Sequence, residues 1–329
     1  MSDALLTVEN LITAFDTEEG NIHAVDGVSF SVERGRTVGI VGESGCGKTV
    51  TALSIIRLLP QPAASIVAGR ILFEGEDLAA ASVERLHEVR GNHIGMIFQE
   101  PMTALNPVHR IGRQITESLK LHRQLSDAQA LEAAVEMLAK VGIPNPEVRV
   151  SEYPHQLSGG MRQRVMIAMA LVCDPGLVIA DEPTTALDVT IQAQILELLQ
   201  QMQDDLGTSI IMITHDLGVI AETCDDVVVM YAGRIAEQGT VEAVFNRPRH
   251  PYTQGLLASI PRLSTPRKSR LRTIEGMVPA LTDMPAGCRF NNRCPHADEH
   301  CTSVYPDIED AHDGHRVACH KWRALEAAS

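Results

Sequence analysis

Eight consecutive residues near the start of the chain have the composition of a phosphate-binding loop. Residues 42–49 match the pattern G-x-x-x-x-G-K-[ST] and follow a short apolar run. The glycines let successive backbone N–H groups point at one anion, and the helix expected after them adds its positive end. Lys48 would reach the β- and γ-phosphates, and the Thr49 hydroxyl would bind Mg²⁺. We expect a nucleoside triphosphate to be bound by Gly42, Glu43, Ser44, Gly45, Cys46, Gly47, Lys48, Thr49 and Val50.

Polar residues with catalytic potential follow three further apolar runs. Asp181 ends one run and is placed to hold Mg²⁺, and Glu182 after it is placed to polarise an attacking water. Gln99 and His215 each follow another run, at the strand ends where α/β proteins build their sites. The catalytic candidates are Glu182, His215, Gln99 and Lys48, and the Mg²⁺ candidates are Thr49, Gln99 and Asp181.

Three other places in the sequence have a less specific chemistry. Ser158 and two glycines stand at an expected helix start, which either binds an anion or only caps the helix. Phe15 either stacks on an adenine ring or packs in the core. Cys46 lies beside Lys48 and a helix start, a setting that can lower a thiol's pKa.

The elements that must position these residues can be read from the apolar pattern. Residues 5–35 alternate apolar and polar positions and break at Gly20, Gly27 and Gly35, which predicts antiparallel strands. Residues 101–165 change to a helical pattern, and an apolar stripe on 131–141 predicts a packed helix face. A helix opened by residues 185–188 is expected to end near Gly207.

The composition limits the classes of function. A net charge of −14 argues against a nucleic-acid-binding surface. No apolar run approaches the roughly 20 residues that span a bilayer. The first residues lack a signal-peptide pattern. We expect a cytosolic protein that serves a membrane by docking to other subunits.

Together these motifs resemble the nucleotide-binding subunit of an ABC transporter over residues 5–240. The resemblance implies an α/β fold, an ABC-type P-loop ATPase with an antiparallel β-subdomain and a helical subdomain. It implies a dimer that sandwiches two ATP molecules, in which the signature loop of one subunit closes on the ATP of the other. The signature residues would be Leu157, Ser158, Gly159, Gly160 and Met161, and the dimer loop Ala186, Leu187 and Asp188.

Residues 241–329, called the C-terminal region below, contain the runs 249–253, 255–261 and 274–276 and then a group of cysteines. These runs look like the C-terminal extension of oligopeptide and dipeptide importer ATPases, closest to the D-type subunit of bacterial dipeptide importers. The resemblance implies a second, similar ATPase subunit, two membrane permeases and, indirectly, a peptide-binding protein, with the chain peripheral at the cytoplasmic face of the inner membrane. Glutathione and nickel importers share much of the pattern. The expected domains are 1–100, 101–165, 166–240 and 241–329.

Four cysteines lie near the end of the chain. They run C-x5-C-x6-C-x17-C, without the short knuckles usual in zinc sites. Four thiolates are the normal ligands of a [4Fe–4S] cluster, and some members of the importer family carry one here. Zinc and free thiols are the alternatives. The proposed ligands are Cys288, Cys294, Cys301 and Cys319.

Two functions of other classes compete with an importer ATPase. A soluble ABC ATPase of DNA repair or translation would need a coiled-coil insertion or a second ATPase half, and a basic face. The sequence has none of these. In the other alternative, the C-terminal region is a redox or iron sensor that controls the ATPase. Transport activity that changes with cluster occupancy under oxidant would favour this alternative.

Overall fold

The chain folds into two compact units in a computed structural model. One unit contains Val32–Arg36 and Ala80–Ile213, and the other contains Leu6–Ser31, Thr37–Ala79 and the chain from Thr214 onward. The four domain boundaries expected from the sequence stay a prediction. The described residues are 4–18, 20–185, 187–260 and 273–326.

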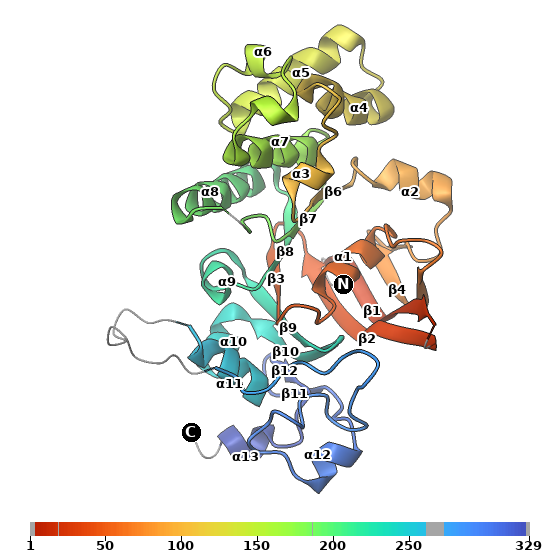
Figure 1. Cartoon of the computed structure of the whole chain (residues 1–329), viewed down its shortest axis with the longest axis vertical. Helices are drawn as coiled ribbons and strands as arrows, with labels where there is room; N and C mark the ends of the chain where they lie inside the picture. The colour runs from red at the N-terminus through yellow and green to blue at the C-terminus, as the bar shows by residue number, and fades with distance from the viewer. Residues whose placement is uncertain (1–3, 19, 186, 261–272, 327–329) are drawn as a thin grey trace. The chain divides into compact units, whose positions relative to one another are not determined.

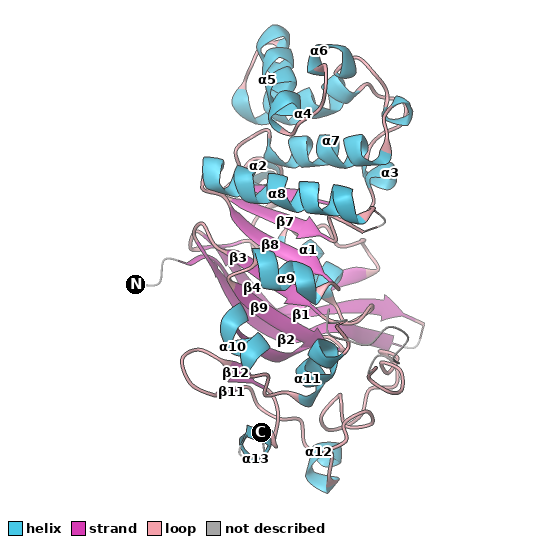
Figure 2. Ribbon diagram, turned by 90° about the vertical axis from the view of Figure 1, so that its left-hand side faces the viewer, coloured by secondary structure: helices cyan, strands magenta, loops and turns pink. Residues whose placement is uncertain are grey.

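Parallel strands form the centre of the first unit. They are β6 (Ile94–Ile97), β7 (Leu177–Asp181) and β8 (Ser209–Thr214). Every residue of β7 and β8 is buried, as expected for strands covered on both faces. Ile97 pairs with Ala180 and Asp181 with Ile213, so the ends of neighbouring strands lie side by side. Figure 2 shows α7 and α8 alongside these strands.

Helices make up most of the rest of this unit. Figure 1 shows α4, α5, α6 and α7 gathered into one group, and α5 contacts the other three. The bounds are α2 (Val83–Val89), α3 (Pro101–Ala104), α4 (Ile111–Arg123), α5 (Asp127–Lys140), α6 (Pro146–Arg149), the 3₁₀ turn η1 (Pro154–Gln156), α7 (Gly159–Leu171) and α8 (Val189–Leu206).

Two helices differ in detail from the sequence expectations. The predicted stripe on α5 is wrong at Leu131, which is 46% exposed, because the small residues Ala130 and Ala134 form the packed face instead. Helix α8 does not start at residue 185. It starts after Asp188, whose side chain accepts a hydrogen bond from the Ile191 N–H. Its predicted end is confirmed, with Gly207 at a positive φ of 66°.

The second unit contains an antiparallel sheet of order β2-β1-β4-β5. Its strands are β1 (Ala4–Thr17), β2 (Gly20–Glu33), β4 (Ala64–Phe73) and β5 (Glu76–Asp77). The first two confirm the predicted antiparallel strands. The expected break at Gly27 is wrong, because glycine tolerates its φ of 78° there and β2 continues through it.

A further set of paired strands in this unit runs in the order β3-β9-β10-β12-β11. Strand β3 is fully buried and parallel to β9, and β10 and β12 are antiparallel. The C-terminal region therefore adds strands directly to β10. The remaining bounds are β3 (Thr37–Val41), β9 (Asp226–Tyr231), β10 (Arg234–Thr240), β11 (Glu309–Asp310), β12 (Arg316–Val317), α1 (Lys48–Ile55), α9 (Leu217–Thr223), α10 (Val241–Asn246), α11 (Pro251–Ala258), α12 (Glu299–Ser303) and α13 (Trp322–Glu326).

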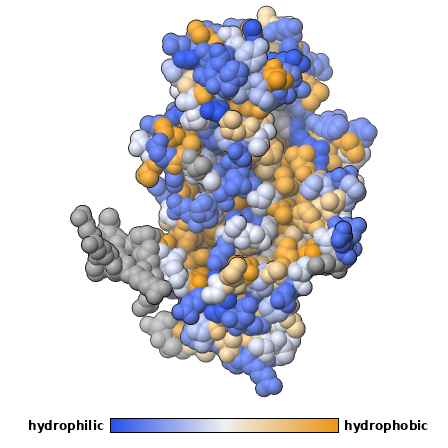
Figure 3. Space-filling view, viewed as in Figure 1, coloured by the Kyte–Doolittle hydropathy of each residue, from blue (hydrophilic) through white to orange (hydrophobic). Residues whose placement is uncertain are grey.

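Among the described residues, no helix combines the length and the apolar character needed to cross a membrane. The face drawn in Figure 3 mixes hydrophilic and hydrophobic residues.

Candidate functional site

The phosphate-binding loop lies between β3 and α1, as the sequence predicts. Gly42 has a φ of 155° and lies so close to the chain that a Cβ would be 2.2 Å from the Met230 carbonyl oxygen. Gly47 has a φ of 100° and would bring a Cβ within 2.6 Å of the Ala24 carbonyl oxygen. Only glycine fits both positions. Gly47 also caps α1 without a side-chain hydrogen bond, so no side chain caps the first N–H groups of this helix.

Lys48 is folded against the loop. Its ammonium group donates hydrogen bonds to the carbonyl oxygens of Gly42, at 2.8 Å, and Glu43, at 3.2 Å. Only 6% of Lys48 is exposed. A buried ammonium held by two carbonyl dipoles is a fixed positive charge within a concave backbone, which suits a phosphate group.

Cys46 corrects a sequence expectation. Its side chain is fully buried, with the thiol 3.9 Å from the Lys48 ammonium nitrogen. Burial raises the pKa of the Cys46 thiol, and the charge of Lys48 lowers it by less. The expectation of a lowered pKa is therefore wrong, because desolvation outweighs the neighbouring charge.

A second group of predicted residues meets at the ends of β6 and β7. Asp181 is 2% exposed, and Glu182 follows it with a φ of 48°. The Glu182 Oε2 atom accepts hydrogen bonds from the Gln99 amide, at 3.2 Å, and from the Thr185 hydroxyl, at 2.7 Å. These contacts hold the carboxylate in one orientation, as a group that must aim at a water molecule requires.

Other predicted residues lie at loop and helix starts. Ser158 caps α7 by accepting a hydrogen bond from the Met161 N–H at 3.3 Å, and both Ser158 and Gly159 are exposed. The capping interpretation is thus confirmed, and anion binding stays a prediction. Asp188 caps α8 in the same way. Ala186 lies outside the described residues.

Phe15 and His215 belong to the second unit, with the phosphate-binding loop. Phe15 pairs with Ala64 across β1 and β4 and is half-buried, so part of its ring stays accessible. His215 directly follows β8 and is exposed. Their contact with a nucleotide stays a prediction.

The four C-terminal cysteines are all free thiols, and Cys319 lies close enough to the other three for their charges to act on it. The pKa of Cys319 is raised to about 12, mainly by burial and in smaller part by Cys288, Cys294 and Cys301. In the described part of the chain, no three His, Cys, Asp or Glu side chains lie close enough to hold one metal ion. The described residues therefore show no preformed metal site, for zinc or for a cluster. A four-iron cluster binds each thiolate to a different iron, so its ligands lie farther apart.

Comparisons with known proteins agree with this geometry. A family model described as ABC transporter matches residues 25–185, and one described as oligopeptide/dipeptide transporter, C-terminal region, matches 236–301. A probable peptide ABC transporter ATP-binding protein, y4tR of Sinorhizobium fredii, is 54% identical over 100% of this chain and 97% of its own length. The chain belongs to the ABC transporter family of ATPases. The family resemblance stated from the sequence is thus confirmed.

Further relatives and solved structures of this family are also similar. The dipeptide transport ATP-binding protein DppD of Bacillus subtilis is 51% identical, over 96% of this chain and 94% of its own length. The dimeric ATP-binding cassette MJ0796, solved with ADP and Pi, has a TM-score of 0.65 and 25% identity, over 72% of this chain and 98% of its own. CbiO1 from Clostridium perfringens has a TM-score of 0.62 and 31% identity, over 74% of this chain and 92% of its own. The predicted ABC fold is therefore confirmed.

Sequence reasoning missed three residues around these groups. Thr185 was treated only as part of a helix start, although its hydroxyl holds Glu182. Tyr252 and Arg293 contact the phosphate-binding loop from the C-terminal region. No local signal marks them, since Arg293 is 250 residues from its partner.

Proposed function

We propose that the chain is the ATP-hydrolysing subunit of a bacterial ABC importer for dipeptides or oligopeptides. The ATPase core is common to transporters of many substrates, so it does not select one. The observation that carries the peptide assignment is the match of residues 236–301 to the C-terminal region of oligopeptide and dipeptide transporters. The relatives named for peptide transport extend over nearly the whole chain.

Within this proposal, each group of residues has a role in hydrolysis. The phosphate-binding loop holds the triphosphate, and Lys48 offsets its negative charge. Glu182 orients the attacking water, and the contacts from Gln99 and Thr185 support that role. His215 donates a hydrogen bond to the γ-phosphate. Mg²⁺, when bound, offsets the charge that develops between the β- and γ-phosphates, and Thr49, Gln99 and Asp181 would hold it.

The proposal includes partners. A second, similar ATPase subunit supplies the other half of a heterodimer, and each signature loop, Leu157 to Met161 in this chain, closes on the partner's ATP. Closure and reopening of the dimer drive two membrane permeases, which receive peptide from a separate binding protein. The chain then lies peripherally at the cytoplasmic face of the inner membrane.

Transport by the reconstituted complex tests the substrate. The chain is purified with its partner ATPase and both permeases in vesicles, and uptake of labelled dipeptide, oligopeptide, glutathione and nickel is compared with and without ATP. ATP-driven peptide uptake supports the proposal. Uptake of only glutathione or nickel would reassign the substrate, and no uptake of any compound would contradict the importer role.

We also propose that Cys288, Cys294, Cys301 and Cys319 hold a structural [4Fe–4S] cluster. The support is that four free, buried or half-buried thiols are neighbours in a segment with few large apolar residues. Replacing any one by serine should release iron and expose the C-terminal region to proteases, while the phosphate-binding loop still binds ATP. Anaerobic purification with iron, sulfide and zinc analysis is the test. One zinc per chain without acid-labile sulfide would contradict the cluster.

A further inference from the structure

The C-terminal region contacts the phosphate-binding loop through Arg293. Its guanidinium group forms a two-pronged ion pair with Glu43, the second residue of the loop, with nitrogen–oxygen distances of 2.6 and 3.0 Å. The Arg293 side chain is only 3% exposed, and that of Glu43 is 31% exposed. Two parallel hydrogen bonds from a buried guanidinium group fix the orientation of the carboxylate, which an exposed surface ion pair does not do.

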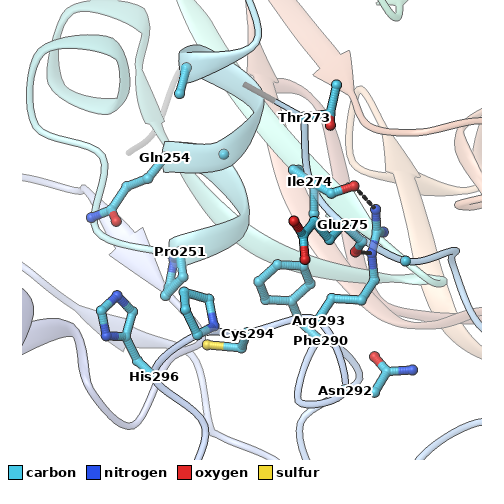
Figure 4. A pocket seen from close by; sticks show the side chains of 14 residues that line it. Pro251, Gln254, Thr273, Ile274, Glu275, Phe290, Asn292, Arg293, Cys294 and His296 are labelled. Atoms are coloured by element: carbon cyan, nitrogen blue, oxygen red, sulfur yellow. Dashed lines mark hydrogen bonds between the residues drawn. The ribbon is translucent and has the colours of Figure 1, made fainter. Parts of the chain in front are cut away.

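The other side of the guanidinium group is also fully engaged. Arg293 donates to the carbonyl oxygens of Glu275, at 2.9 Å, and Ile274, at 3.3 Å, and to the Tyr231 hydroxyl. Figure 4 shows this side chain at one wall of a pocket of about 760 Å³, turned toward the backbone of residues 274 and 275. Arg293 therefore connects Glu43 to an otherwise irregular segment of the C-terminal region.

Tyr252 holds the same loop residue by its backbone. Its hydroxyl accepts a hydrogen bond from the Glu43 N–H at 2.9 Å. The ring is fully buried on α11 and packs edge-on against Tyr231, with 4.7 Å between the ring centres. The Glu43 carbonyl oxygen meanwhile accepts from Lys48. The side chain, the N–H and the carbonyl of Glu43 are thus all held, two of them by the C-terminal region.

We propose that Arg293 and Tyr252 are positioning residues that hold the phosphate-binding loop in its ATP-binding conformation and so make ATP affinity depend on the C-terminal region. A loop that is ordered before binding loses less conformational entropy when the nucleotide enters. Arg293 also compensates the Glu43 carboxylate, which otherwise repels a triphosphate. This proposal rests on the proposed ATPase function.

Linkage makes the effect reciprocal. If the contacts raise the affinity for ATP, bound ATP strengthens the contacts by the same factor. MgATP should therefore slow the hydrogen exchange of residues 273–276 in the wild-type chain. In Arg293→Ala, MgATP should leave these exchange rates unchanged. A purely structural role for Arg293 would not link these exchange rates to the nucleotide.

The experiment measures MgATP affinity of the full chain by calorimetry. We expect Arg293→Ala to weaken binding about tenfold, within the usual range of coupling between sites. Glu43→Ala removes the ion pair together with the repelling carboxylate, so it should weaken binding less than Arg293→Ala does. The double variant should be no weaker than Arg293→Ala. Arg293→Lys should recover part of the affinity. Tyr252→Phe keeps the ring and removes only the hydroxyl that accepts from the Glu43 N–H. This single change should therefore also weaken MgATP binding.

Controls separate the outcomes. Arg323→Ala removes an exposed arginine that pairs with Glu309 in the same region and should leave affinity unchanged. In the assembled complex, Arg293→Ala should raise the KM for ATP and leave kcat within about twofold, because Glu182 is untouched. If Arg293→Ala does not fold, Arg293→Lys and Tyr252→Phe carry the test. Affinities within twofold of wild type in all folded variants would overturn this proposal, whereas a wild-type chain that binds no ATP would overturn the proposed function.

Discussion

The Gln99 amide donates a hydrogen bond to Glu182 Oε2 over 3.2 Å, which joins the ends of the neighbouring strands β6 and β7. The sequence assigns these two residues separate roles, and the structure shows that their side chains are in direct contact. The Thr185 hydroxyl binds the same oxygen. Two side chains therefore hold the carboxylate through Oε2 and fix its orientation.

We expect Glu182→Gln to lower kcat for ATP by about 10²- to 10⁴-fold, the range for losing a general base, while ATP still binds. Glutamine keeps the size and the hydrogen bonds but cannot take up a proton from water. Steady-state hydrolysis by the assembled complex and nucleotide occupancy are measured together. Glu197→Gln makes the same change at an exposed position of α8 and serves as the matched control. Near-normal turnover of Glu182→Gln at this site would show that its role is wrong.

Thr185→Val should lower kcat about tenfold with little change in the KM for ATP, since one hydrogen bond to a charged group is lost. Valine has nearly the same shape as threonine, so packing around residue 185 is kept. Thr185→Ser retains the hydroxyl and should behave as wild type. Equal losses in the valine and serine variants would point to packing instead of the hydrogen bond.

Local patterns predicted much of the fold and the separate motifs. The phosphate-binding loop could be predicted because its glycines, Lys48 and Thr49 are consecutive and follow a buried strand. The contact between Glu43 and Arg293 could not, because a carboxylate near a nucleotide has many partners available and nothing local selects one 250 residues away. Leu131 shows a different limit. Ala130 and Ala134 are buried on α5 where Leu131 is exposed, and apolar periodicity alone ranks alanine below leucine.

Cys46 should react slowly with a maleimide at neutral pH. Burial excludes the reagent and raises the pKa of the thiol, so little thiolate is present. The rate should increase as pH rises above the ordinary value of 9.0 for a cysteine. Labelling followed by peptide mapping measures each cysteine separately. If Cys46 is the first of the seven to be modified at neutral pH, this prediction fails. Cys46→Ser should keep ATP affinity, because the thiol is not the group that contacts phosphate.

The buried His250 predicts a stability that falls with acid. Burial lowers its pKa to about 4 from an ordinary value of 6.5, although Glu237 acts in the opposite direction. Between pH 4 and pH 6.5 the unfolded chain binds more protons at this histidine than the folded chain does. The contribution of neutral His250 to the free energy of unfolding is therefore complete above pH 6.5 and is lost as the pH falls toward 4. We expect this residue alone to remove about 2 kcal/mol of unfolding free energy between about pH 6.5 and pH 5.

Urea unfolding of His250→Asn isolates that contribution from other titrating groups. The His250 Nδ1 atom accepts a hydrogen bond from the Tyr252 N–H at 3.0 Å and so caps α11. Asparagine can supply the same capping acceptor but does not titrate. The variant should therefore lose less stability than the wild type over this interval, by about the amount assigned to His250. Parallel pH dependences for the two proteins would mean that His250 is protonated in the folded chain or does not contribute. Tyr252 also accepts from the Glu43 N–H, so acid that weakens this cap should lower ATP affinity in the wild type more than in His250→Asn.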